Sequence, residues 1–367
     1  MLRRLLFVLF FIPILLFSQE QNTHTTYLDA NYFYGTILRH NKDISHLITG
    51  HPEGLIIGYN QQTYGSERWH KLYNYPDYGV SFVYHNPHNT TLGENYGLYG
   101  HFNFYYLKRN LMVRIGQGIA YASNPFDIEE NFNNNAYGSD LLSSTYLMLN
   151  YNKKHLFKSK LGLQTGISLI HYSNANVRSP NASTNTFSFN IGLQYHLDEA
   201  SENEFLSEKD YKKVSEPIHF NLVLRSGINE SDYFGLGKQP FLVISSFLDK
   251  RLSYKSKLQF GADAFFSKFL QQEIEYLYAS RLDRSLKGDE DFKRVGVFVG
   301  HELRISNPLA VVAQFGYYVY YPYDFEGRFY QRVGLTYYLR KDVFLNSTLK
   351  THAAKAEAIE FGIGIRL

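Results

Sequence analysis

The sequence has no cysteine, a single Trp and three Met among its 367 residues. Without cysteine the chain can form no disulfide framework and carry no lipid on an N-terminal cysteine. A cysteine nucleophile and cysteine-ligated metals are excluded for the same reason. Any catalytic or metal-binding function must therefore be sought among other residue types.

Strong net charge is also absent. The chain has 37 Lys and Arg against 34 Asp and Glu, a formal net charge of +3. This balance leaves no basic footprint for nucleic acid, so no nucleic-acid partner is predicted. Fourteen His residues are scattered without a metal-ligand spacing, and no HExxH motif occurs. We therefore expect no metal and no cofactor.

Long apolar runs are confined to the start of the chain. The mean hydropathy is −0.32, and no later stretch has the pattern of a membrane-spanning helix. Residues 5–17 are apolar, follow the basic pair Arg3 and Arg4, and precede the small residue Ser18. This order is typical of a secretory signal peptide, which we place at residues 1–18.

Aromatic residues are abundant, with 32 Tyr and 29 Phe making up most of the 17% aromatic content. Segments of about ten residues alternate between apolar and polar side chains. In residues 359–367, for example, Glu360, Gly362, Gly364 and Arg366 separate apolar residues. Alternation also suits a soluble β-sandwich. Together with the signal peptide and the aromatic load, it favours an all-β, transmembrane, antiparallel up-and-down β-barrel over residues 19–367.

The links between the predicted strands differ in length. Short links occur at residues 108–110, 304–307 and 340–342, and long links at 123–139 and 267–291. Counted from Tyr27, the short links follow even-numbered strands. Because outer-membrane barrels have short periplasmic turns, this parity predicts that both termini are periplasmic. The long, charged link at residues 198–216 breaks the rule.

The strand number depends on weak segments near residues 52–64 and 343–353. Counting all candidates gives about sixteen strands, and merging or losing weak ones gives about fourteen or twelve. We expect one barrel of about 12–16 strands. The alternative is two eight-stranded halves that meet at the charged link, near residue 207.

The polar faces of the strands carry Arg114, Arg225, Arg294 and Glu302. In a membrane barrel these side chains point into the lumen. Their simplest role is a polar barrel interior, and the competing interpretation is that they line a pore.

The hairpin at residues 161–197 carries the residues with catalytic potential. Because side chains alternate along a strand, His171, Ser173 and Asn185 share the apolar face, at the end with the loop. Residues i and i+2 lie roughly 6.5–7 Å apart at Cα, so an imidazole can reach a nearby hydroxyl. A Ser hydroxyl, a His base and a third group that orients the ring form a nucleophile–base arrangement.

The segment HYSNANVRSPNASTN, residues 171–185, resembles the signature of the outer-membrane lipid A 3-O-deacylases, the PagL family. That signature runs His-x-Ser-Asn-Ala, then Pro-Asn, then a polar residue that closes the loop. Proteins of this family are outer-membrane barrels that remove the ester-linked 3-position acyl chain of lipid A with a Ser-His-Glu triad. The resemblance implies lipid A, or lipopolysaccharide, in the outer leaflet as the partner.

The resemblance also implies roles for individual residues. His171 would be the general base, Ser173 the nucleophile, and Asn174 with the backbone N–H of Asn176 the oxyanion hole. The family's Glu falls on Asn185 in this sequence. An amide can orient an imidazole, but it cannot neutralise an imidazolium as a carboxylate does.

The resemblance covers residues 27–197, the deacylase-like part. Trp69 with the pair Tyr75 and Pro76 and with Gly79, and also residues 131–139, resemble segments of longer Bacteroidota-type acyloxyacyl hydrolases. Residues 198–367 are assigned only as additional barrel strands and loops.

Two hypotheses follow. The first is an outer-membrane carboxylic ester hydrolase that acts on lipid A. The second is a porin-like channel or structural barrel that retains the motif without its activity, motivated by Asn185 and by the doubled length.

Overall fold

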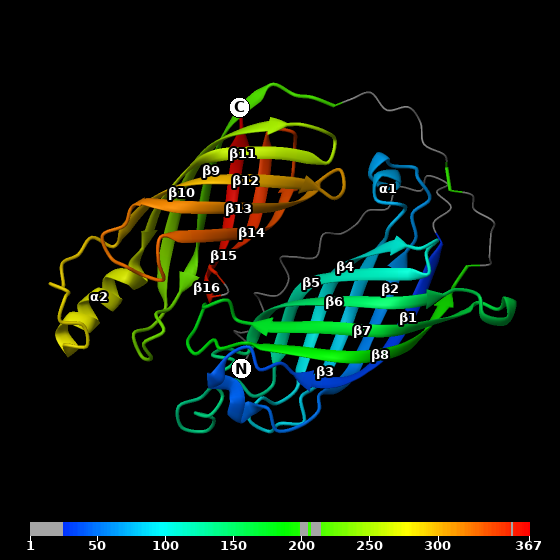
Figure 1. Ribbon diagram of the computed structural model, residues 1–367, viewed down its shortest axis with the longest axis horizontal. Coiled ribbons are helices and arrows are strands. Elements are labelled where there is room, and N and C mark those ends of the chain that lie inside the picture. Colours follow the sequence, from blue (N-terminus) through cyan, green and yellow to red (C-terminus); the bar gives the residue numbers. More distant parts are fainter. Residues whose placement is uncertain (1–24, 199–204, 207–213, 354) are drawn as a thin grey trace, which may run out of the picture.

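The computed structural model describes residues 25–198, 205, 206, 214–353 and 355–367, in which two separate barrels are formed (Figure 1). The predicted signal peptide and part of the charged link lie outside these residues. The first barrel comprises β1 (Thr26–Ile37), β2 (Glu53–Gln61), β3 (Asp77–Asn86), β4 (Asn95–Tyr106), β5 (Leu111–Ala122), β6 (Leu141–Lys153), β7 (Leu161–Ser173) and β8 (Thr184–His196). The second comprises β9 (Ile218–Asn229), β10 (Gln239–Arg251), β11 (Ser256–Ser267), β12 (Lys293–Arg304), β13 (Leu309–Tyr320), β14 (Phe329–Tyr338), β15 (Val343–His352) and β16 (Lys355–Arg366).

Each barrel is a closed, antiparallel, up-and-down sheet in which every strand pairs with its neighbours in sequence. The first barrel closes by pairing of β1 with β8, where Tyr32 lies opposite Ile191. The second closes by pairing of β16 with β9, where Ile363 lies opposite Leu224. The all-β, up-and-down prediction is therefore confirmed.

The expectation of one large barrel is wrong, and the alternative of two eight-stranded halves is observed. The weak segments near residues 52–64 and 343–353 are strands β2 and β15. Alternation and strand count are the same for one large barrel and two small ones. The difference lies in whether β8 pairs with β9 or returns to β1, a long-range choice that local patterns do not encode.

Apolar side chains cover the outside of the barrels, and polar side chains fill the inside. On β1, Leu28, Tyr32 and Tyr34 are exposed, whereas Asp29 and Asn31 are buried. This arrangement is the reverse of a soluble sandwich and suits a wall that faces lipid. Within the described residues, no helix has the length and apolar content needed to cross a bilayer.

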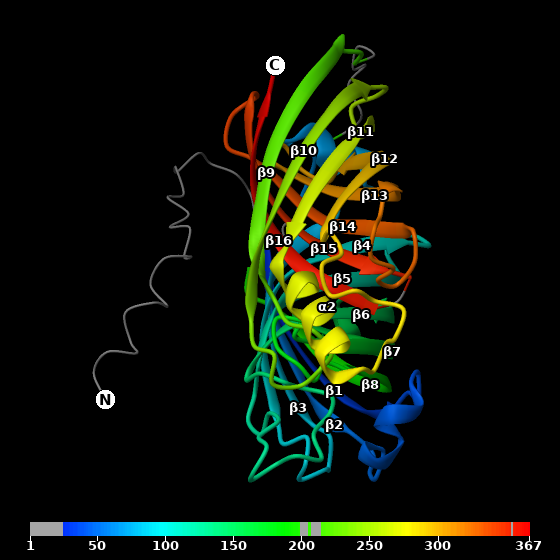
Figure 2. The same ribbon diagram turned by 90° about the vertical axis from the view of Figure 1, so that its left-hand side faces the viewer.

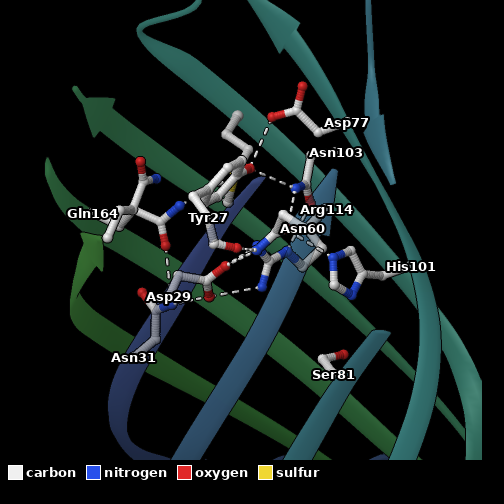
Figure 3. A network of polar contacts seen from close by, with 12 residues as sticks. Tyr27, Asp29, Asn31, Asn60, Asp77, Ser81, His101, Asn103, Arg114 and Gln164 are labelled. Atoms are coloured by element: carbon white, nitrogen blue, oxygen red, sulfur yellow. Dashed lines mark hydrogen bonds and ion pairs between the residues drawn. The ribbon is translucent and has the colours of Figure 1, made fainter. Parts of the chain in front are cut away.

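The interior of the first barrel is centred on an ion pair between Arg114 and Asp29 (Figure 3). Arg114 Nη2 lies 2.6 Å from Asp29 Oδ2, and Arg114 Nε donates to Asn103 Oδ1 at 2.7 Å. Asn60 also donates to Asp29 Oδ2, at 2.6 Å. His101 Nε2 lies 2.8 Å from Asn60 Oδ1, which extends the network across the barrel.

The interior of the second barrel also contains buried ion pairs, formed by other residues. Arg332 lies between two carboxylates. Its Nη1 is 2.9 Å from Asp263 Oδ2, and its Nε is 2.5 Å from Glu360 Oε2. Arg294 pairs with Glu357 and Lys257 with Glu302, all buried. Buried aromatic rings pack around these pairs, including those of Phe265, Tyr318 and Tyr330. The prediction of a polar interior is confirmed for Arg114, Arg225, Arg294 and Glu302, which are all buried.

The two barrels lie side by side, as both views show (Figures 1 and 2). At one end, the link between β2 and β3, which contains α1 (Arg68–Leu72), docks on the second barrel. Tyr73 Oη donates to the Arg304 carbonyl at 2.6 Å, and Asn307 Nδ2 donates to Glu67 Oε2 at 2.7 Å. The β2–β3 link lies at the same end of the barrels as the short turns. Its contact with the second barrel explains why it is longer than they are.

The Arg114–Asp29 pair provides a stability test. Arg114→Met leaves the Asp29 carboxylate buried without its cation, which costs about 3–5 kcal/mol. We expect the variant to unfold at a lower urea concentration than the wild type. The measurement is the urea concentration at which the compact gel mobility of the folded barrel is lost. The double variant Arg114→Met/Asp29→Asn leaves no buried charge at this position and is expected to lose less. Unfolding of Arg114→Met at the wild-type urea concentration would contradict this account.

Candidate active site

His171 and Asn185 face one another on the outer wall of the first barrel. They are direct cross-strand partners in the β7–β8 pairing. His171 Nδ1 lies 2.8 Å from Asn185 Oδ1. Because an amide oxygen only accepts, Nδ1 carries the proton and Nε2 keeps its lone pair. This is the tautomer that a general base needs.

Ser173 ends β7 and is buried. Its Oγ donates to Asn181 Oδ1 at 3.0 Å and accepts from the backbone N–H of Ala175 at 2.9 Å. The predicted hydrogen bond from Ser173 to His171 is thus not made in this conformation. Of the three predicted residues, the structure therefore brings His171 and Asn185 into contact. The hydroxyl of Ser173 instead bonds to the loop that follows β7.

The residues predicted for the oxyanion hole lie in that loop, residues 174–183, which we call the site loop. The backbone N–H of Asn176 donates to Asn174 Oδ1 at 3.0 Å. The side-chain amide of Asn174 donates to the Arg178 carbonyl at 2.5 Å. Both candidate donors therefore lie close to Ser173 in sequence and are engaged within the loop.

Ala175 and Asn176 are both left-handed, with φ of 53° and 64°. Asn tolerates this conformation better than most residues, and glycine adopts it most readily. The two residues reverse the chain directly after Ser173. This tight turn brings the N–H of Ala175 back onto the Ser173 hydroxyl.

Two residues at the site were not assigned a role from the sequence. Asn181 accepts from both Ser173 Oγ and the backbone N–H of Asn174, at 3.0 Å and 2.9 Å. Its signal was the Pro-Asn pair within the motif. His40, from the β1–β2 link, places Nε2 3.2 Å from Ser183 Oγ. Nothing in the sequence connects residue 40 to this loop, since the contact arises only when β1 closes on β8.

A row of polar residues crosses the outer wall beside the site. Gln117 on β5 lies opposite Thr145 on β6, and Thr145 lies opposite His171. Thr145 Oγ1 donates to Gln117 Oε1 at 2.5 Å. Apolar side chains that are exposed flank this row on the same face, including Ile115, Ile119 and Leu147. The row is thus a polar strip on an apolar exterior, and it runs through the His171–Asn185 pair.

The acidic segment around Asp127 has a local structural explanation. Asp127 Oδ1 accepts the backbone N–H groups of Glu129 and Glu130, at 2.9 Å and 3.0 Å. These N–H groups, that of Glu130 first, lower the pKa of the exposed Asp127 carboxyl. Across the part of the chain that the structure describes, no group of three or more His, Asp or Glu could hold a metal ion.

Two protein-family models match the barrels separately. Residues 53–194 match the lipid A 3-O-deacylase (PagL) model. Residues 218–367 match the model of the acyloxyacyl hydrolase C-terminal domain. The chain belongs to the PagL family. The resemblance predicted from residues 171–185 is therefore confirmed, and membership of the PagL family assigns the barrels to the bacterial outer membrane.

Solved structures of membrane barrels align over 94% of the chain. Outer membrane protein Omp33 of Acinetobacter baumannii is 8% identical, with 98% of its chain covered and a TM-score of 0.19. A Rh. blastica porin variant is 9% identical, with 100% covered and a TM-score of 0.20. OccAB3 of A. baumannii is 11% identical, with 99% covered and a TM-score of 0.22. TM-scores this low show no detailed similarity between these structures and this member of the PagL family. No curated protein matches the chain.

The Asn185 position offers a test of the site that needs no natural substrate. Asn185→Glu gives His171 a carboxylate partner, which is worth about 1.5–3 kcal/mol for a hydrogen bond to a charged group. We expect a fluorophosphonate probe to label Ser173 roughly 10- to 100-fold faster. Asn185→Gln has the same length without the charge and should show no such gain. Equal labelling rates for Asn185→Glu and the wild type would contradict this role of Asn185.

Proposed function

We propose that this protein is an outer-membrane serine esterase that removes an ester-linked acyl chain, at the 3-O position, from lipid A in the outer leaflet. The observation that carries the proposal is the position of His171 and Asn185 on the lipid-facing wall of the first barrel. An acyl ester held in a leaflet meets the outside of a barrel and not its interior. Membership of the PagL family supports lipid A as the substrate class.

The lengths of the links support the orientation. The links after β4, β12 and β14 are short, whereas those after β5 and β11 are long, and the latter contains α2 (Lys268–Ser280). Since periplasmic turns are short and outer loops long, the end with the site loop is the outer one. Both termini are then periplasmic, and the site lies at the level of the outer leaflet.

Catalysis begins when the Ser173 hydroxyl turns from Asn181 towards Nε2 of His171. Ser173 Oγ attacks the ester carbonyl while His171 takes its proton. The tetrahedral intermediate collapses, the sugar hydroxyl leaves with the proton from His171, and the acyl chain stays on Ser173. A water molecule, deprotonated by His171, then releases the fatty acid and restores the serine.

The developing oxyanion needs donors aimed at it. Asn174 and the N–H of Asn176 supply them once the carbonyl oxygen replaces their present acceptors in the site loop. The N–H of Ala175 already points at Ser173 Oγ. Asn185 orients His171 throughout, but it leaves the imidazolium without a counter-charge. We infer a slower enzyme than one with Glu at this position.

The packed interiors argue against the alternative of a porin-like channel. Barrels of eight strands have interiors that are just wide enough for side chains. Here ion pairs such as Arg114–Asp29 and Arg332–Glu360 lie across them, fully buried. Arg114 and Arg294, which could line a pore in a wider barrel, are held by carboxylates instead.

The direct test is Ser173→Ala in a strain that lacks the native gene. Mass spectrometry of lipid A should show loss of one acyl chain with the wild type and retention with Ser173→Ala. Ser168→Ala is the control, because Ser168 lies on the same strand and bonds Ser188 inside the barrel, at 2.7 Å. It should deacylate as the wild type does. Identical lipid A with the wild type, Ser173→Ala and the empty strain would overturn the proposal.

A further inference from the structure

The site loop of the first barrel is held by the second barrel. The β9–β10 link, residues 230–238, lies against it at the end of the barrels that carries α2. The backbone N–H of Glu230 donates to the Asn176 carbonyl at 3.1 Å. In return, Asn176 Nδ2 donates to the Glu230 carbonyl at 2.9 Å. The second barrel therefore forms two hydrogen bonds with Asn176, a residue predicted to belong to the oxyanion hole.

The Glu230 carboxylate forms the centre of this contact. Glu230 Oε2 accepts the backbone N–H of Ser179, and Oε1 accepts that of Gly237 in its own link, each at 3.0 Å. Ser179 Oγ donates to the Ser231 carbonyl at 2.7 Å. Glu230 is only 7% exposed, and Asn176 and Ser179 are 4% exposed. Hydrogen bonds from N–H groups to a shielded carboxylate are stronger than those between neutral groups.

The link is in turn anchored in its own barrel. Ser231 Oγ donates to Glu273 Oε2 on α2 at 2.5 Å. Tyr323 Oη donates to the other oxygen of Glu273 at 2.7 Å. The apolar face of α2 packs at Phe269 and Ile274 against neighbouring rings. A continuous set of contacts thus runs from the outer end of the second barrel to the site loop.

We propose that Glu230 is a positioning residue for the active site, so that the second barrel completes the catalytic apparatus of the first. This inference rests on the proposed function. Glu230 touches no reacting atom. It holds the site loop so that Asn176, two residues after Asn174 and three after Ser173, keeps the left-handed turn beside the nucleophile.

The test uses the full-length protein in detergent micelles with purified lipid A. Glu230→Ala removes both carboxylate acceptors, and we expect kcat to fall roughly 10- to 100-fold. KM should stay near the wild-type value, because Glu230 does not meet the substrate. Fluorophosphonate labelling of Ser173 should slow in parallel. Glu230→Gln keeps the shape and one acceptor, so its kcat should fall less than that of Glu230→Ala, by about 2- to 10-fold.

Tyr73→Phe is the matched control. It removes an inter-barrel hydrogen bond of 2.6 Å at the opposite end, away from the site loop. A purely adhesive role for the interface predicts similar losses for Tyr73→Phe and Glu230→Ala. Our proposal predicts unchanged kcat for Tyr73→Phe. Should Glu230→Ala fail to fold, Glu230→Gln and Ser179→Ala decide, each with a loss of about 2- to 10-fold in kcat.

The failure of this inference differs from the failure of the proposed function. Wild-type kcat in Glu230→Ala, with Ser173→Ala inactive, overturns the positioning role alone. No deacylation by the wild type overturns the proposed function.

Discussion

Closure of each sheet is the constraint on which the structure depends. In a bilayer, backbone N–H and C=O groups have no water to bond, so a membrane-spanning sheet must have no free edge. Here β8 returns to β1 and β16 returns to β9. Closure with eight strands leaves room for side chains and little else inside. The buried ion pairs fill that room, and the outer wall is left as the surface on which a membrane-embedded substrate can be met.

The same closure determines where catalytic chemistry can occur. On a strand that alternates polar-in and apolar-out, a His and an Asn that face outward are exceptions. The β7–β8 hairpin carries His171 and Asn185 on its outer face at the loop end. The polar row through Gln117 and Thr145 extends the exception across two more strands. Because polar side chains are costly on a lipid-facing wall, this strip is better explained by function than by folding.

Much of this was predictable from the sequence, for identifiable reasons. Alternation located the strands, and the parity of residues 171 and 185 placed both side chains on one face, as observed. The number of barrels was not predictable, because the same pattern suits either closure; the rule-breaking link at residues 198–216 was the one indication. The partner of Ser173 depends on the left-handed turn at Ala175 and Asn176, and Glu230 belongs to the other barrel. The Pro-Asn pair of the motif marked Asn181 but not its hydrogen bond to Ser173, and no local pattern marked Glu230.

The central claim is that Ser173 on the outer wall carries the acyl group during turnover. Trypsin should release residues 161–178 as one peptide, since Lys160 and Arg178 bound it. Acid quenching during turnover of lipid A, followed by mass spectrometry of this peptide, measures the claim directly. The account predicts a fatty acyl mass on Ser173 that is absent in His171→Gln. An acyl group on another residue would contradict it, as would turnover without any acylated peptide.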